Sequence, residues 1–159
     1  MASDPPLTAP PPVWVLDTSV ALKWFRPAEV HAPQARALRA RYLRGEIRLA
    51  APDLLLYEFA NVLRYKGELT TRQVIAAVET LYDLEIEWLP ASAVIMETAV
   101  RLAREWDVTI YDAVFASTAQ VLAAPLVSAD ERLVRKMKGA AIHFLGDLDA
   151  SQADSEAGS

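Results

Sequence analysis

The chain has 159 residues, of which 53% are hydrophobic, and a formal net charge of −5. This length suffices for one domain with a buried core, and the hydrophobic content excludes a largely disordered chain. No apolar run is long enough to cross a bilayer, and the start of the chain lacks the pattern of a signal peptide, so we expect a cytoplasmic protein without membrane contact. The absence of cysteine excludes disulfides and thiolate metal sites, and the two histidines, His31 and His143, argue against zinc.

Both ends of the chain differ in composition from its middle. Residues 1–12 contain five prolines, which predicts an extended, flexible leader outside the fold. Residues 146–159 are small, polar and acidic, which predicts a flexible tail. We therefore expect a single folded domain over residues 13–145.

Strands and helices are predicted to alternate within this domain. Short apolar runs predict five strands, at residues 13–16, 47–50, 86–89, 125–128 and 141–144. Helical periodicity and capping residues predict the main helices between them, at 20–25, 32–44, 54–63, 71–82, 93–106 and 110–120. This alternation is typical of an α/β fold in which helices flank a mainly parallel sheet of about five strands.

The first predicted strand, Val13–Leu16, ends in Asp17, Thr18 and Ser19. Four consecutive apolar residues are typical of a strand buried on both faces, and ligands bind at the carboxyl ends of such strands. Asp17 is therefore either a functional acid at the rim of the sheet or the N-cap of the following helix. On this residue alone, capping is the better interpretation.

Glu58 lies in one of the most apolar segments of the chain, where burial of an unpaired carboxylate is unfavourable. Asn61 follows one helical turn later, which suggests a polar spot that faces inward. The alternative is that Glu58 lies at the solvent edge of its helix.

Asp112 and Asp130 are two further acids in apolar surroundings. Asp112 is the only charge in the predicted helix at 110–120, although the helix dipole also favours an acid in the first turn. Asp130 follows the predicted strand at 125–128, as Asp17 follows the first strand. Four carboxylates gathered at one rim would require a cation, and oxygen ligands alone favour Mg²⁺ or Mn²⁺.

A basic segment follows the first strand. Of the 16 basic residues, seven lie between positions 23 and 48, namely Lys23, Arg26, Arg36, Arg39, Arg41, Arg44 and Arg48. A solvated helix face and a patch that faces RNA explain this segment equally well. The acidic net charge argues only weakly against a nucleic-acid partner.

The chain resembles the PIN-domain ribonucleases, specifically the VapC toxins of toxin–antitoxin pairs. The resemblance spans about Val13 to Phe144 and rests on four segments, Leu16–Ser19, Glu58–Asn61, Tyr111–Ala113 and Ser128–Asp130 with Leu133. It implies a PIN-like fold in three layers. It also implies that the catalytic metal ligands are Asp17, Glu58, Asp112 and Asp130, with supporting residues Thr18, Ser19, Asn61 and Ser128. Whether Glu131 joins them is left open.

The same resemblance implies Mg²⁺-dependent hydrolysis of RNA by a homodimer that a cognate VapB-like antitoxin silences. We expect Trp24, Phe25 and Tyr57 to form the docking surface for that antitoxin, and Thr18 and Ser19 to take over the capping of the first helix. Two alternatives remain. One is a housekeeping PIN nuclease that processes RNA without an antitoxin, and the other is a catalytically silent PIN-like scaffold that binds RNA or protein.

Overall fold

The structure is a computed structural model that describes residues 3–4 and 8–151. Parts of the predicted leader and of the predicted tail therefore lie outside the described residues. A 3₁₀ turn, η1 (Leu145–Asp147), spans the predicted boundary between domain and tail and begins with a fully buried leucine. The predicted domain boundaries remain predictions.

Five strands form one sheet, in which every neighbouring pair is parallel. The strands are β1 (Val13–Leu16), β2 (Arg48–Pro52), β3 (Glu87–Leu89), β4 (Leu126–Ser128) and β5 (Ile142–Phe144). Their spatial order is β3-β2-β1-β4-β5. This confirms the predicted α/β fold and its five strands, and the sheet is parallel throughout.

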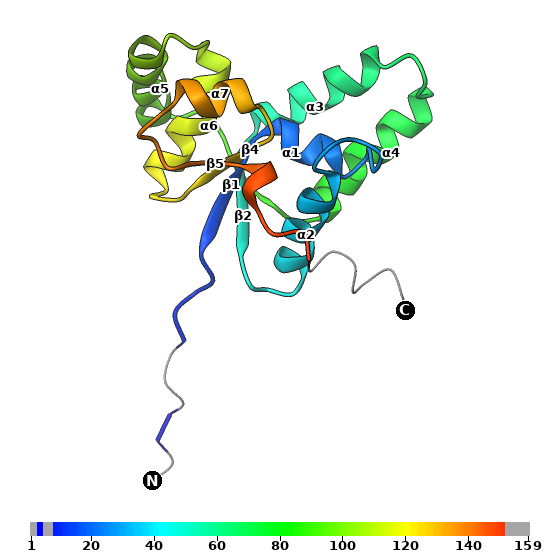
Figure 1. Cartoon of the computed structure of the whole chain (residues 1–159), viewed down its shortest axis with the longest axis horizontal. Helices are drawn as coiled ribbons and strands as arrows, with labels where there is room; N and C mark the ends of the chain where they lie inside the picture. Colours follow the sequence, from blue (N-terminus) through cyan, green and yellow to red (C-terminus); the bar gives the residue numbers. More distant parts are fainter. Residues whose placement is uncertain (1–2, 5–7, 152–159) are drawn as a thin grey trace.

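Helices cover both faces of the sheet. They are α1 (Thr18–Lys23), α2 (Ala32–Leu43), α3 (Leu54–Tyr65), α4 (Thr71–Asp83), α5 (Ala93–Trp106), α6 (Ile110–Val121) and α7 (Glu131–Lys136). Figure 1 shows α5, α6 and α7 on one side of the sheet and α1 to α4 on the other. Right-handed crossovers produce this division, because the chain moves from β1 toward β3 through α1–α4 and then returns to β4 through α5 and α6.

The strand order identifies the place where a ligand is expected. From β1 the chain continues to one edge of the sheet, and from β4 it continues to the other edge. The carboxyl ends of β1 and β4 therefore flank the point at which the direction of winding reverses, and ligands of open parallel sheets bind at this point. Asp17 directly follows β1, and Asp130 lies two residues beyond β4.

The core holds these strand ends in place from both faces. Val15 and Leu16 of β1 are fully buried. Phe59 of α3 is also fully buried on one face of the sheet, and Phe115 of α6 is only 1% exposed on the opposite face. Burial of a large side chain of this kind contributes about 1.5–3 kcal/mol relative to its exposure. In the described part of the chain, no helix combines the length and apolar character that a membrane span needs.

Candidate functional site

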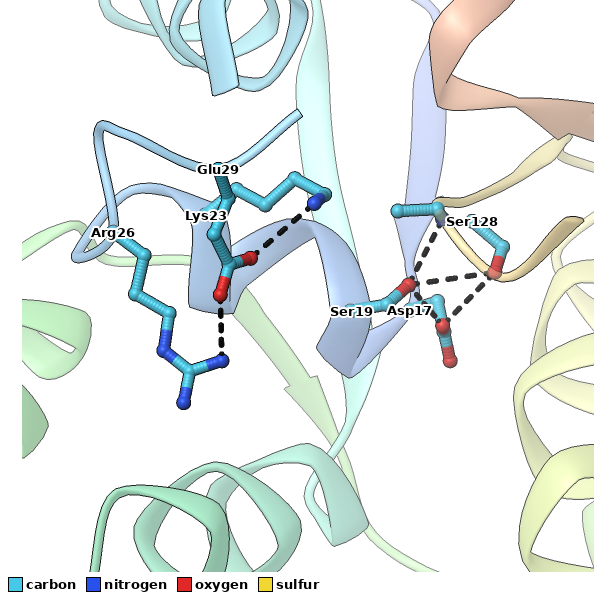
Figure 2. Close-up of polar contacts among 7 residues, drawn as sticks. Asp17, Ser19, Lys23, Arg26, Glu29 and Ser128 are labelled. Atoms are coloured by element: carbon cyan, nitrogen blue, oxygen red, sulfur yellow. Dashed lines mark hydrogen bonds and ion pairs between the residues drawn. The ribbon is translucent and has the colours of Figure 1, made fainter. Parts of the chain in front are cut away.

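Asp17 is held at the carboxyl end of β1 and is only 8% exposed. Its backbone N–H donates to the Val127 carbonyl of β4 at 3.0 Å. Its Oδ2 accepts hydrogen bonds from the hydroxyls of Ser19 and Ser128, the latter at 2.9 Å, and Figure 2 shows both serines directed at this carboxylate. Although Asp17 occupies the N-cap position of α1, its side chain makes no capping hydrogen bond, so the capping interpretation is wrong.

The two serines are themselves fixed by the backbone that follows β4. The Ser19 Oγ accepts a hydrogen bond from the Ala129 N–H at 2.9 Å, and the Ser128 Oγ accepts one from the Asp130 N–H at 3.0 Å. Because the lone pairs of both oxygens receive these donors, both hydroxyl protons are directed at Asp17. The carboxylate is therefore held by two oriented hydroxyl donors, and the Ser19 backbone also favours its charged form.

Glu58 lies on α3 and is half-buried against α1. Its Oε1 accepts a hydrogen bond from the Thr18 hydroxyl at 2.9 Å. The Thr18 and Ser19 hydroxyls thus hold Glu58 and Asp17, and the predicted capping of α1 by these two residues is wrong. The inward orientation predicted for Glu58 is confirmed, because its carboxylate contacts a buried residue.

Burial and mutual repulsion raise the pKa of both carboxyl groups. Burial is the main reason why the pKa of Asp17 lies above its ordinary value; its serine hydrogen bonds oppose this shift, and the charge of Asp112 adds to it. Burial likewise raises the pKa of Glu58, and the charges of Asp17 and Asp112 add to that effect. Asp17, Glu58 and Asp112 therefore share one negative potential, which a bound cation would relieve.

Asp112 and Asp130 both lie near the start of a helix. Asp112 is in the first turn of α6, and its N–H donates to the Thr109 hydroxyl at 3.1 Å. Asp130 is the N-cap of α7, since its Oδ1 accepts from the Leu133 N–H at 3.1 Å. Asp112 thus joins the shared potential, whereas one oxygen of Asp130 already stabilises a helix end.

Two polar residues suggested by the sequence lie elsewhere. Asn61 is exposed and lines a groove between α3 and α4 together with Tyr57 and Arg64, so it does not face inward beside Glu58. In the described residues, Asn61 makes no hydrogen bond to any of the acids. Glu131 is exposed and pairs with Arg135 at 2.6 Å. The structure brings neither Asn61 nor Glu131 into the acidic cluster.

The donor chemistry of this cluster fits a hard divalent ion. Within residues 3–4 and 8–151, no three acidic or histidine side chains converge as a ready-made ligand set for a single ion. Burial is the main cause of the raised pKa of Asp17 and of Glu58, and the charge of Asp112 adds to both, so a cation bound here would favour the ionised carboxylates. The available donors are carboxylate oxygens, which suit Mg²⁺ or Mn²⁺.

Five of the seven residues of the basic segment form ion pairs with nearby acids. Lys23 at the end of α1 and Arg26 in the following loop both pair with Glu29, at 3.3 and 2.9 Å, and Figure 2 shows these pairs apart from Asp17. Further ion pairs join Arg41 and Arg44 to Glu46, and Arg48 to Glu87. Of the two interpretations of this segment, the structure favours the solvated helix face.

The predicted docking surface is only partly exposed. Trp24 is 7% exposed and its indole N–H donates to the Ala35 carbonyl at 2.8 Å, so its assignment to a docking surface is wrong. Phe25 is half-buried and packs edge-on against Phe59, with ring centroids 5.1 Å apart. Tyr57 remains 74% exposed, and Tyr111 beside Asp112 is 63% exposed. Sequence reasoning missed the exposure of Tyr111, although an aromatic residue next to a suspected metal ligand was a usable signal.

Comparisons with known proteins agree with this architecture. The PIN domain profile matches residues 14–139. The solved structure of PAE2754 from Pyrobaculum aerophilum has 26% sequence identity and a TM-score of 0.59, with 84% of each chain covered. None of the curated proteins matches the chain.

Two toxin–antitoxin complexes contain chains with the same fold. The DNA-bound VapBC of Salmonella typhimurium matches with 18% identity and a TM-score of 0.66, covering 84% of this chain and 98% of that one. VapBC2 of Rickettsia felis, bound to a DNA fragment from its promoter, matches with 15% identity and a TM-score of 0.64, covering 83% and 98%. Since the matched profile spans most of the sequence, from β1 through α7, the chain belongs to the PIN domain family.

Proposed function

We propose that this chain is a metal-dependent endoribonuclease and the toxin component of a VapBC-type toxin–antitoxin pair. The observation that carries the proposal is the arrangement at the carboxyl end of β1, where Ser19 and Ser128 hold Asp17 and Thr18 holds Glu58. Asp112 is near enough for its charge to raise the pKa of both acids. The fold shared with the Salmonella and Rickettsia VapBC complexes supports the assignment as a toxin.

Asp17, Glu58 and Asp112 would hold the ion, and Asp130 would contribute the oxygen that does not cap α7. Mg²⁺ or Mn²⁺, when bound, supplies activation of a water and stabilisation of charge on the phosphate oxygens. No protein nucleophile is required.

The remaining polar side chains orient the acids. Ser19 and Ser128 hold the Oδ2 of Asp17 and would thereby orient its carboxylate in the site. Thr18 holds Glu58 in the same way. Because burial raises the pKa of Glu58 and the residue is still half-exposed, Glu58 is the best-placed base for the proton of the attacking water.

The proposed partners follow from the same assignment. A VapB-like antitoxin would cover the acidic site. The exposed Tyr57 and Tyr111, which line the same pocket and are sequence neighbours of Glu58 and Asp112, would give that partner apolar contacts. Two copies of the chain would form the active homodimer. Size-exclusion chromatography with light scattering measures this state directly, and a monomer at working concentration would contradict it.

The direct test is cleavage of RNA by the purified chain. We expect Mg²⁺ or Mn²⁺ to support endonucleolytic products from cellular RNA, and EDTA to abolish them. An absence of cleavage with either ion would favour the silent scaffold. To separate a toxin from a housekeeping nuclease, the neighbouring reading frame of antitoxin size is co-expressed, and only a toxin is neutralised by it.

A further inference from the structure

We infer that a small pocket between the start of α6 and α7 binds a backbone phosphate of the RNA substrate through Arg132 and Lys136. This inference rests on the proposed nuclease function and adds the residues that would position the substrate. The pocket has a volume of about 100 Å³ and is lined by Asp107, Val108, Thr109, Asp112, Arg132, Leu133 and Lys136. That volume is well below the roughly 300–1,000 Å³ of pockets for drug-sized ligands, so it suits a single small group rather than a whole nucleotide.

Arg132 is exposed and has no ion pair or hydrogen bond within the described residues. It lies in the first turn of α7, where the helix dipole disfavours a positive charge. The neighbouring Arg135 is different, because it pairs with Glu131 at 2.6 Å and does not line the pocket. Neither packing nor helix stability therefore accounts for the charge of Arg132.

Lys136 lies one helical turn after Arg132 and lines the same pocket. Like charges four residues apart repel each other on a helix surface. The Lys136 ammonium donates to the neutral Asp107 carbonyl at 2.6 Å, while the Asp107 carboxylate is 3.8 Å away and fully exposed to solvent. Such an exposed contact is screened by water, so most of the positive charge remains available to an anion.

The pocket adjoins the acidic site, because Asp112 contributes to its wall. Asp112 is also the residue whose charge raises the pKa of both Asp17 and Glu58. An anion held by Arg132 and Lys136 therefore lies next to the place where the acids would bind metal and the scissile phosphate. A neighbouring phosphate of the same strand fits this arrangement, since successive phosphates are joined through one ribose.

The test measures RNA binding by matched variants in a cleavage-deficient Asp17→Asn background. A short fluorescein-labelled single-stranded RNA of mixed sequence is titrated at several salt concentrations. We expect Arg132→Gln to weaken binding about tenfold, as for the loss of one hydrogen bond to a charged group. The slope of log affinity against log salt should fall by about 0.7, as for one lost phosphate contact on a single strand. Lys136→Gln should act in the same direction.

Arg135→Gln is the control, because it removes a charge from the same helix outside the pocket. Equal losses for Arg132→Gln and Arg135→Gln would show a general charge effect and overturn the inference. In the wild-type background, Arg132→Gln should raise KM with little change in kcat, as expected for uniform binding. If the wild type cleaves RNA and Arg132→Gln matches it in KM and affinity, the inference fails while the proposed function stands.

A second measurement distinguishes the failure of the proposed function from the failure of the pocket. In metal-free buffer of matched ionic strength, inorganic phosphate should raise the Tm of wild type and Arg135→Gln more than that of Arg132→Gln. If the wild type shows no cleavage and no RNA binding, the proposed function and the RNA assignment both fail. An equal phosphate shift in all three proteins would exclude the anion pocket itself.

Discussion

Replacement of Asp17 by asparagine separates the stability of the site from its activity. Burial holds the pKa of Asp17 above its ordinary value, so the folded protein binds this proton more tightly than the unfolded chain does. The stabilisation by the protonated form is complete below the unfolded pKa of about 3.9 and is lost as pH rises through the folded pKa. At neutral pH the metal-free protein therefore contains an unfavourable buried charge.

Asparagine removes that charge and keeps the shape. Its amide oxygen can accept from Ser19 and Ser128, and its NH₂ group takes the place of Oδ1. We expect the metal-free variant to gain about 0.5–2 kcal/mol, the range typical of a stabilising substitution at a strained site. For a domain of this size, that gain corresponds to a Tm increase of about 1–8 °C.

The assay compares thermal unfolding in EDTA with cleavage of RNA in Mg²⁺. Asp17→Asn should lose more than about 100-fold in activity, since residues that only support metal ligands already contribute 10–100-fold. Asp83→Asn, at the exposed end of α4, is the control and should change neither quantity. The stability gain of Asp17→Asn should also shrink as pH falls toward 4. A metal-free variant that is less stable than wild type at pH 7 would refute the reasoning.

Three further predictions concern the same site. Mg²⁺ at ten times its Kd should stabilise the wild type by about 1.4 kcal/mol, or roughly 3–6 °C in Tm, and should leave the Tm of Asp17→Asn unchanged. An unchanged Tm of the wild type would contradict a metal site. Thr18→Val removes a hydrogen bond that lowers the pKa of Glu58, so the pKa of Glu58 should rise. The acidic limb of the kcat/KM–pH profile should then move to higher pH, and an unmoved limb would argue against Glu58 as the base. Asp130→Ser retains an N-cap for α7 and removes the carboxylate, so the Tm measured by circular dichroism should stay unchanged while activity falls. A lower Tm with unchanged activity would leave Asp130 with only its capping role.

Local patterns in the sequence were sufficient to predict the architecture. All five strands occur where apolar runs predicted them, with ends shifted by up to two residues, as for residues 47–50 against Arg48–Pro52 of β2. The helices predicted at 71–82 and 93–106 also occur, and the side chains of Thr70 and Ser92 cap them, because a side-chain cap depends only on residues within one turn. Alternation of strands and helices then restricts the topology, since crossovers between parallel strands are right-handed.

Orientation and long-range pairing could not be predicted in the same way. Asn61 lies three residues after Glu58, yet three residues span only about five sixths of a helical turn, and the edge of the buried stripe passes between the two. The burial of Trp24 depends on Ala35 of α2, and the partner of Arg48 is Glu87 on another strand. A single sequence contains no signal for contacts of this kind.

The position of the charges indicates how RNA would approach the site. Glu29, Glu46 and Glu87 pair with five of the seven basic residues in the segment that spans α1, α2 and β2. On the other face of the sheet, Arg132 on α7 has no such partner within the described residues, and it lies beside Asp112. Because Arg132 lines the pocket that adjoins Asp112, we expect the strand to pass over α6 and α7 rather than over the arginine-rich helix. Charge reversal at Arg36 on α2 should therefore weaken RNA binding less than charge reversal at Arg132, and the opposite order in the same titration would place the RNA path on the α2 side.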